Sequence, residues 1–156
     1  MSLCVIKNIK LEKSKKLVDA VYKNFKHLVP YEELMHNKEE LTRLVTNPQS
    51  HILFIMVNKK IAAYLIGELK DLNDGRRVFY ISYIYTAINH RKKGFASKLI
   101  SYIEALCKKF KYDGILLTMD IDDESVHNFY QMRGFMPDMM LRRYNKFNVL
   151  YKSVFA

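Results

Sequence analysis

Apolar residues recur along the chain with two different periods, and the period changes near residue 50. Before that point the apolar spacing is three and four residues, which predicts an amphipathic helix that begins near Ser14 and ends at Pro30. A second helix is predicted over about Glu32–Val45, where Asn47-Pro48 follows. The short alternating segment Val5–Ile9 predicts a strand ahead of both helices.

Between residues 52 and 86 the pattern is typical of strands. Ile52–Val57, Ile61–Lys70 and Val78–Thr86 are rich in β-branched and aromatic residues, which fit a pleated sheet. Asn58-Lys59-Lys60 and Asn73-Asp74-Gly75 are polar connections of the kind found in turns. Three strands with short connections predict an antiparallel meander.

The rest of the chain alternates helix and strand. Gly94–Phe110 has a helical apolar stripe, Gly114–Met119 is a continuous apolar strand, and Glu124–Met132 is a short helix ended by Gly134. Two more strands are predicted at the end of the chain, near Met139–Arg143 and Phe147–Val154.

The predicted element order is therefore β-αα-βββ-α-β-α-ββ. It indicates an α/β (α+β) fold, with a mixed, mostly antiparallel central sheet of about seven strands flanked by four helices. No repeat or Pro/Gly-rich linker interrupts the sequence, so we predict a single domain over residues 1–156.

Composition narrows the class of protein. Hydrophobic residues make up 49% of the chain, enough for a core without disulfides or a structural metal. Cys4 and Cys107 lie far apart, which favours reduced thiols and a cytoplasmic location. The five histidines lack metal-ligand spacing, so no metal site is expected. The longest apolar runs are strand-sized, and neither a signal peptide nor a membrane span is predicted.

The formal net charge of +10 favours anionic partners. A solvated surface rich in lysine explains this charge as well as a nucleotide cofactor or a nucleic acid does. Charge alone does not decide between them.

A basic turn before the third helix carries the first functional signal. The segment His90–Ile100 joins a strand to a helix that opens at Gly94, with Ala96 two places later. The first N–H groups of a helix have no intrahelical partner, and the helix dipole is positive there. Small residues let a phosphate approach these groups, and Arg91, Lys92 and Lys93 add positive charge. The turn predicts a diphosphate site, although an ordinary capped helix with a basic start explains the string equally well.

A second motif lies downstream, over Asn128–Phe135. The segment Arg91–Ala96 resembles the acyl-CoA loop of the GNAT superfamily of N-acetyltransferases. Phe129-Tyr130-x-x-x-Gly134-Phe135 resembles the closing helix motif of the same superfamily. The order of strand, loop, helix, buried strand and tyrosine helix also agrees. The resemblance is strong over about residues 50–137, and the first 50 residues match only in having two helices after a strand.

The resemblance implies that acetyl-CoA is the cosubstrate and that main-chain amides of the basic loop hold its pyrophosphate. The implied loop residues are Arg91, Lys92, Lys93, Gly94, Phe95 and Ala96. It also implies that Ile84, Tyr85 and Thr86 pair with the pantetheine arm, in a slot where this strand and Gly114–Met119 splay apart. Tyr130 would hydrogen-bond the thioester sulfur and protonate the departing thiolate. A packed aromatic beside Phe129 and Phe135 is the alternative for Tyr130.

Two features depart from the family pattern. Asp123 stands where members often carry an asparagine that meets the cofactor, and it suits the N-cap of a helix better. The segment Tyr80–Tyr85 carries no acid to act as general base. Glu68 is the best candidate base, while Tyr83 or Tyr85 could position a water that takes the proton. Glu32 and Glu33, which could face the substrate, are also left open.

The sequence therefore predicts an N-acetyltransferase (an acyltransferase of the EC 2.3.1 type). It would transfer acetyl from acetyl-CoA to a primary amine of a small molecule or peptide, by direct attack and without a covalent enzyme intermediate. A catalytically silent acyl-CoA-binding domain is the main alternative. A basic nucleic-acid-binding module is disfavoured, because the tyrosines do not interleave with basic residues on one strand face. The amine-bearing acceptor cannot be read from the sequence, and a homodimer is left open.

Overall fold

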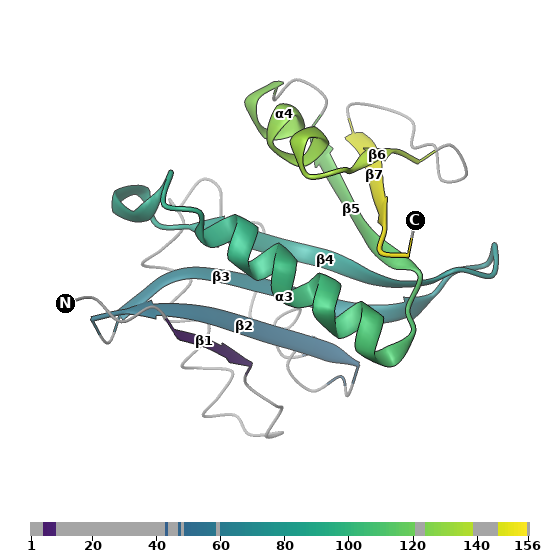
Figure 1. Cartoon of the computed structure of the whole chain (residues 1–156), viewed down its shortest axis with the longest axis horizontal. Helices are drawn as coiled ribbons and strands as arrows, with labels where there is room; N and C mark the ends of the chain where they lie inside the picture. The colour runs from purple at the N-terminus through teal and green to yellow at the C-terminus, as the bar shows by residue number, and fades with distance from the viewer. Residues whose placement is uncertain are drawn as a thin grey trace. The chain divides into compact units, whose positions relative to one another are not determined.

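The computed structural model describes residues 5–8, 43, 47, 49–58, 60–120, 124–138 and 147–155 (Figure 1). Seven strands and two α-helices are assigned within these residues. In chain order the elements are β1 (Val5–Asn8), β2 (Ser50–Val57), β3 (Lys60–Asp71), β4 (Arg77–Thr86), the 3₁₀ helix η2 (Ile88–His90), α3 (Phe95–Phe110), β5 (Gly114–Asp120), α4 (Glu124–Met132), β6 (Met136–Pro137) and β7 (Phe147–Ser153).

The chain divides into two compact units. The first contains Met1–Glu68 and Ser82–Ser101, and the second contains Leu69–Ile81 and Tyr102–Ala156. The prediction of a single domain over residues 1–156 stays a prediction.

In the first unit, β1, β2 and β3 form an antiparallel sheet. Val5 pairs with Met56, and the β2–β3 register runs from Ser50↔Glu68 to Val57↔Lys60, with an irregularity between Ile55 and Met56. β2, β3 and the first turns of α3 bury most of the apolar side chains that the structure describes there. The most deeply buried are Ile52, Leu53, Ile55, Ala63, Tyr64, Leu65, Ile66 and Leu99.

In the second unit the sheet is mixed. β4 and β5 pair in parallel over three residue pairs, from Val78↔Gly114 to Tyr80↔Leu116. β7 pairs antiparallel with the whole of β5, and β6 pairs antiparallel with β7. The first pair of β5 and β7 requires a glycine, because a Cβ at Gly114 would overlap the Lys152 carbonyl oxygen and the Tyr151 ring. Phe79, Ile103, Cys107, Ile115, Leu117 and Phe135 are buried in this unit.

Both described α-helices end in the same way. Lys111 has φ 60° and Gly134 has φ 90°, so each helix is followed by a residue in the left-handed backbone conformation. The N–H of Tyr112 donates to the Cys107 carbonyl at 2.8 Å, and the N–H of Phe135 donates to the Tyr130 carbonyl at 3.1 Å. These bonds satisfy carbonyls that the helix leaves unpaired. The second one also fixes the chain direction where α4 ends, at Gly134 and Phe135.

The three predicted strands of the meander are confirmed as β2, β3 and β4, which are neighbours in that order, with β2 and β3 antiparallel. The helix near Gly94–Phe110, the strand near Gly114–Met119 and the helix Glu124–Met132 are also confirmed. The two predicted N-terminal helices and the predicted strand near Met139–Arg143 lie outside the described residues. The described partner of β7 in that part of the chain is Met136–Pro137. Within the described part of the chain, no helix combines the length and apolar character that crossing a bilayer requires.

Candidate functional site

The basic loop before α3 has an unusual backbone. Lys92 has φ 65° and Gly94 has φ 79°, so two residues of this short loop are left-handed. Alternation of left-handed and ordinary residues turns successive N–H groups toward one point, which forms an anion-binding concavity. Arg91, Lys92, Lys93 and Gly94 are all exposed, whereas the Phe95 side chain is buried and anchors the helix start.

The start of α3 suits an anion. The N–H of Lys98 donates to the Gly94 carbonyl at 3.0 Å, so Gly94 caps the first turn. That turn contains no acidic residue that could neutralise the positive end of the helix dipole. A Cβ placed on Gly94 meets no atom within 4 Å, so the space above the glycine is open. The loop therefore has the backbone and the charge predicted for a diphosphate site.

The loop is attached to the end of β4. The N–H of Ala87 donates to the Ala62 carbonyl of β3 at 2.8 Å, and the N–H of His90 donates to the Ala87 carbonyl at 2.8 Å. The Nε of Arg91 donates to the Thr86 carbonyl at 3.2 Å, and its guanidinium lies 5.5 Å from the centroid of the Tyr85 ring. Of the predicted cofactor residues, the structure thus brings Tyr85, Thr86 and Arg91 together.

Tyrosines gather beside this strand end. The Tyr64 ring of β3 lies 5.9 Å from the Tyr85 ring, at an interplanar angle of 34°. Burial raises the pKa of the Tyr64 phenol, and the nearby Tyr85 and Tyr83 raise it further. Tyr64 therefore stays protonated at neutral pH and has no use as a base. Its packing against Tyr85 was not anticipated from the sequence, because strand residues so far apart in number give no local signal.

Glu68, the predicted base, is a buried carboxylate with 5% of its surface exposed. The Nδ2 of Asn47 donates to its Oε2 at 2.7 Å, and the Nη1 of Arg43 lies 3.8 Å from the same oxygen. The Oδ1 of Asn47 accepts the Gln49 N–H at 2.9 Å, so the Asn47 amide is held in one orientation. The sequence indicated Asn47 only as part of a helix stop.

Ser50 is the direct cross-strand partner of Glu68. Its Oγ is buried and has no hydrogen-bond partner among the described residues. Direct cross-strand partners share a face of the sheet, so this hydroxyl lies on the side of the sheet that carries the Glu68 carboxylate.

Tyr130, in the second unit, lies on α4 with 6% of its surface exposed. Its ring meets Phe129 and Phe135 edge to face, at centroid distances of 5.1 and 5.3 Å. Arg133 lies 3.5 Å above the Phe129 ring, and its Nη1 donates to the Phe129 carbonyl at 2.8 Å. Burial raises the pKa of Tyr130 to about 12, and the positive charge of Arg133 opposes that rise. The aromatic packing that the sequence offered as an alternative is present, together with a phenol that is neutral at physiological pH.

Cys107 belongs to the core of the second unit. It is fully buried, with its Sγ 3.9 Å from the Gly114 carbonyl oxygen. Burial raises the pKa of this thiol to about 11, so it is not a nucleophile at neutral pH.

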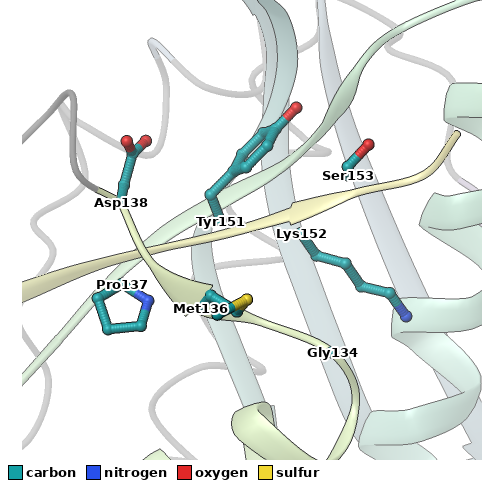
Figure 2. Close-up of a pocket in the computed structure, with 7 residues that line it drawn as sticks. All are labelled: Gly134, Met136, Pro137, Asp138, Tyr151, Lys152 and Ser153. Atoms are coloured by element: carbon teal, nitrogen blue, oxygen red, sulfur yellow. The ribbon is translucent and has the colours of Figure 1, made fainter. Parts of the chain in front are cut away.

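A cavity of about 430 Å³ lies at the edge of the second unit, beside the end of β7. Figure 2 shows Asp138, Tyr151 and Ser153 on one side of the strand, and Met136 and Lys152 on the other. Its charged groups already have partners: Asp138 accepts a hydrogen bond from Arg76 at 2.8 Å, and Lys152 pairs with Glu104 at 2.5 Å. Both charged side chains among the described lining residues are therefore already paired.

Among the described residues, no group of three or more histidine, cysteine, aspartate or glutamate side chains is arranged to hold a metal ion. Asp123, Glu32 and Glu33 lie outside those residues.

Comparison with protein families identifies the class. Residues 18–135 match the model of the acetyltransferase (GNAT) family, and this range includes both the basic loop and the tyrosine helix. The chain belongs to the GNAT acetyltransferase family. No curated protein matches the sequence significantly.

Solved structures give the same fold. NAA60 from Arabidopsis thaliana, solved with acetyl-CoA, has a TM-score of 0.75 at 10% identity, covering 99% of this chain and 100% of its own. The ribosomal-protein-S18-alanine N-acetyltransferase from Escherichia coli has a TM-score of 0.71 at 12% identity, covering 97% and 94%. Naa50 from Arabidopsis thaliana, solved with the bisubstrate analogue CoA-Ac-MVNAL, has a TM-score of 0.69 at 16% identity, covering 96% and 99%.

Family membership confirms acetyl-CoA as the cosubstrate and acetyl transfer as the class of activity. At these low identities the structural likeness shows the fold alone. The roles of individual residues stay predictions.

Proposed function

We propose that this protein transfers the acetyl group of acetyl-CoA to a primary amine, by direct attack of the amine nitrogen on the thioester carbon. The observation that carries this proposal is the loop before α3. It combines left-handed Lys92 and Gly94 with exposed cations and a helix start free of acids. These features suit the pyrophosphate of the cosubstrate.

The cofactor residues are proposed as the family resemblance implies. Main-chain amides of Arg91, Lys92, Lys93, Gly94, Phe95 and Ala96 bind the pyrophosphate. Ile84, Tyr85 and Thr86 at the end of β4 pair with the pantetheine amides, as an added strand would. This role requires β4 and β5 to separate beyond their paired ends.

Tyr130 is proposed to act on the leaving group. When the amine attacks, the carbon–sulfur bond breaks and the sulfur leaves as a thiolate. The Tyr130 pKa of about 12 keeps the phenol protonated, so it can donate a hydrogen bond to that sulfur. A thiol has a pKa of about 8.5, so its thiolate is a weaker base than the Tyr130 phenolate. The phenol therefore stabilises the developing charge on the sulfur, and the proton that the nitrogen loses after its attack completes the thiol.

Glu68 is proposed to accept, directly or through a water, the proton that the ammonium form of the acceptor loses before it attacks. Its carboxylate is held in place by Asn47 at 2.7 Å, which fixes the direction of its oxygens. Water positioned by Tyr83 or Tyr85 stays the alternative route for the proton.

The acceptor is proposed to be the N-terminal amine of a peptide. Two of the similar structures carry this chemistry in their names: one enzyme acts on the alanine of ribosomal protein S18, and one is bound to a CoA conjugate of the peptide MVNAL. The net charge of +10 favours acidic peptides over polyamines. The cytoplasmic location, a single domain and a homodimer stay proposals.

A panel of acceptors tests this function. Peptides with a free N-terminus, the same peptides with a blocked N-terminus and one internal lysine, and polyamines are each mixed with acetyl-CoA. Thiol release and the acceptor mass are then measured. We expect free thiol and a gain of one acetyl group with the free N-terminal peptides. Acetylation of the blocked peptides instead would overturn the N-terminal assignment, while thiol release without an acetylated acceptor would overturn amine transfer.

A catalytically silent acyl-CoA-binding domain is the second candidate, favoured by the engaged state of Glu68. Glu68→Gln tests the proposed base, because glutamine still accepts the Asn47 hydrogen bond but cannot take a proton. We expect this variant to lower kcat by about tenfold or more, with the KM for acetyl-CoA within about twofold. Unchanged kcat would remove Glu68 from the mechanism. Binding of acetyl-CoA by the wild type without thiol release across the whole panel would establish the silent domain.

A further inference from the structure

The side chain of Arg91 differs from the other cations of the basic loop. Its Nε donates to the Thr86 carbonyl, and its guanidinium lies over the Tyr85 ring. Both partners belong to the end of β4, five and six residues earlier in the chain. Lys92 and Lys93 make no such contact with the described residues.

These contacts continue into the sheet. The Tyr85 ring lies against Tyr64, which has 1% of its surface exposed and therefore cannot move without opening the core. The N–H of Ala87 donates to the Ala62 carbonyl, two residues before Tyr64 on β3. Arg91 thus connects the loop to a fixed point, through a hydrogen bond and a cation–π contact that use different parts of its guanidinium group.

We propose that the side chain of Arg91 is a positioning group that holds the basic loop against the end of β4, and that its guanidinium is not a ligand of the cofactor phosphates, whereas its main-chain amide keeps the proposed place in the pyrophosphate site. The side chain acts through Thr86 and Tyr85. It keeps the β4 edge proposed for the pantetheine arm in a fixed position relative to the loop amides proposed for the pyrophosphate. Its effect on catalysis rests on the proposed function, whereas its effect on the loop does not.

Two other roles are open to an exposed arginine in this loop. It could leave β4 and bind a phosphate as a bidentate donor, as arginine often does. It could also be a surface group whose contacts contribute little, as many exposed contacts do. The three roles differ in what happens when Arg91 is replaced.

Amide hydrogen exchange in the absence of cofactor tests the contact itself. Arg91→Gln removes the guanidinium, and Arg77→Gln is the matched control. Arg77 also lies over a tyrosine ring, 4.3 Å from the centroid of Tyr112, and pairs with Asp71, so the control loses the same charge and the same kind of contact in the other unit. We expect exchange at Ala87 and His90 to rise about fivefold in Arg91→Gln and to stay unchanged in Arg77→Gln. Equal exchange in both variants and the wild type would overturn the proposal.

Comparison of two acetyl donors tests whether Arg91 positions the loop or binds a phosphate. Acetyl-CoA carries phosphates, whereas S-acetylpantetheine carries none. We expect Arg91→Gln to lower kcat/KM about fivefold for both donors, because the pantetheine edge is disturbed in either case. Lys93→Gln is expected to lower it for acetyl-CoA only.

An effect of Arg91→Gln on acetyl-CoA alone would identify Arg91 as a phosphate ligand and overturn the proposal. Absence of thiol release by the wild type from both donors would be a failure of the proposed function. In that case the exchange measurement alone decides whether Arg91 holds the loop.

Discussion

Tyr130 is the residue whose environment and proposed chemistry agree most closely. Burial keeps its phenol protonated, and two phenylalanine rings fix its position without using the hydroxyl. Tyr130→Phe keeps that packing and removes only the hydroxyl. We expect kcat to fall about 10- to 100-fold, with the KM for acetyl-CoA within about twofold, in a thiol-release assay.

Tyr112→Phe is the matched control for this prediction. Tyr112 is also a buried tyrosine of the second unit, with 8% of its surface exposed, and it has no place in the proposed site. We expect its activity to match the wild type. Equal loss in both variants would show that the phenols matter for stability, and full activity of Tyr130→Phe would remove it from the mechanism.

Sequence reasoning found single residues where a local motif marks them. Gly94 and Tyr130 stand in short patterns whose physical purpose can be stated: a left-handed backbone at a turn, and a phenol on a short helix. Asn47 beside Glu68 and Arg91 over Tyr85 were not found, because side-chain direction across strands and turns has no local sequence signal. The residues that orient a site are therefore harder to predict than the residues in it.

At the scale of elements, the basic loop depends on its glycine. Gly94 and Gly75 are both left-handed, with φ 79° and 92°, and a Cβ on either meets no atom within 4 Å. Alanine at each position therefore costs the same backbone strain, about 1 kcal/mol. We expect Gly94→Ala and Gly75→Ala to lower the Tm equally, by about 2–4 °C.

Only Gly94→Ala is expected to lower the affinity for acetyl-CoA as well, because its new methyl group occupies the space proposed for the pyrophosphate. Titration with acetyl-CoA measures this, with Gly75→Ala as the control for strain. Equal affinity of the two variants would place the phosphate away from Gly94.

The close approach of β5 and β7 makes a different prediction. A Cβ on Gly114 would lie 2.6 Å from two atoms of the Tyr151 ring and closer still to a backbone oxygen of Lys152. The ring can rotate, but the backbone oxygen is held in the sheet. We expect Gly114→Ala to destabilise the fold by about 3 kcal/mol, visible in a denaturant titration. A decrease in the free energy of unfolding of less than about 1 kcal/mol would mean that β7 can move to accommodate the methyl group.

Elements with strong periodicity were predicted well, and short ones were not. The helix near Gly94–Phe110 and the strand near Gly114–Met119 agree with α3 and β5 almost to the residue, because one has a full apolar stripe and the other a continuous apolar run. β6 has two exposed residues and one is a proline, so neither alternation nor β-propensity marks it. Its pairing is set by β7, which the local sequence does not reveal.

At the scale of the whole molecule, the family was predictable because two motifs occur in order at a fixed distance. Each motif by itself has an ordinary structural explanation. The match of residues 18–135 to the family model includes both motifs and confirms the predicted family. The acceptor was not predictable, because the physical signal for acetyl-CoA is a phosphate-binding backbone, whereas an amine substrate leaves no comparable pattern in the sequence.

Ligand-induced stability is the prediction that concerns the whole fold. A ligand that binds only the folded state at 100 times its dissociation constant adds ~2.7 kcal/mol to the free energy of unfolding. For a chain of 156 residues this corresponds to a rise in Tm of about 5–10 °C. The rise should shrink with added salt, because exposed Arg91, Lys92 and Lys93 surround the proposed phosphate position and their charges are screened. Pantetheine at the same concentration is the control and should give a smaller rise that salt does not change. A saturating dose of acetyl-CoA that leaves Tm unchanged would rule out acetyl-CoA binding, and with it both the transferase and the silent-domain proposals.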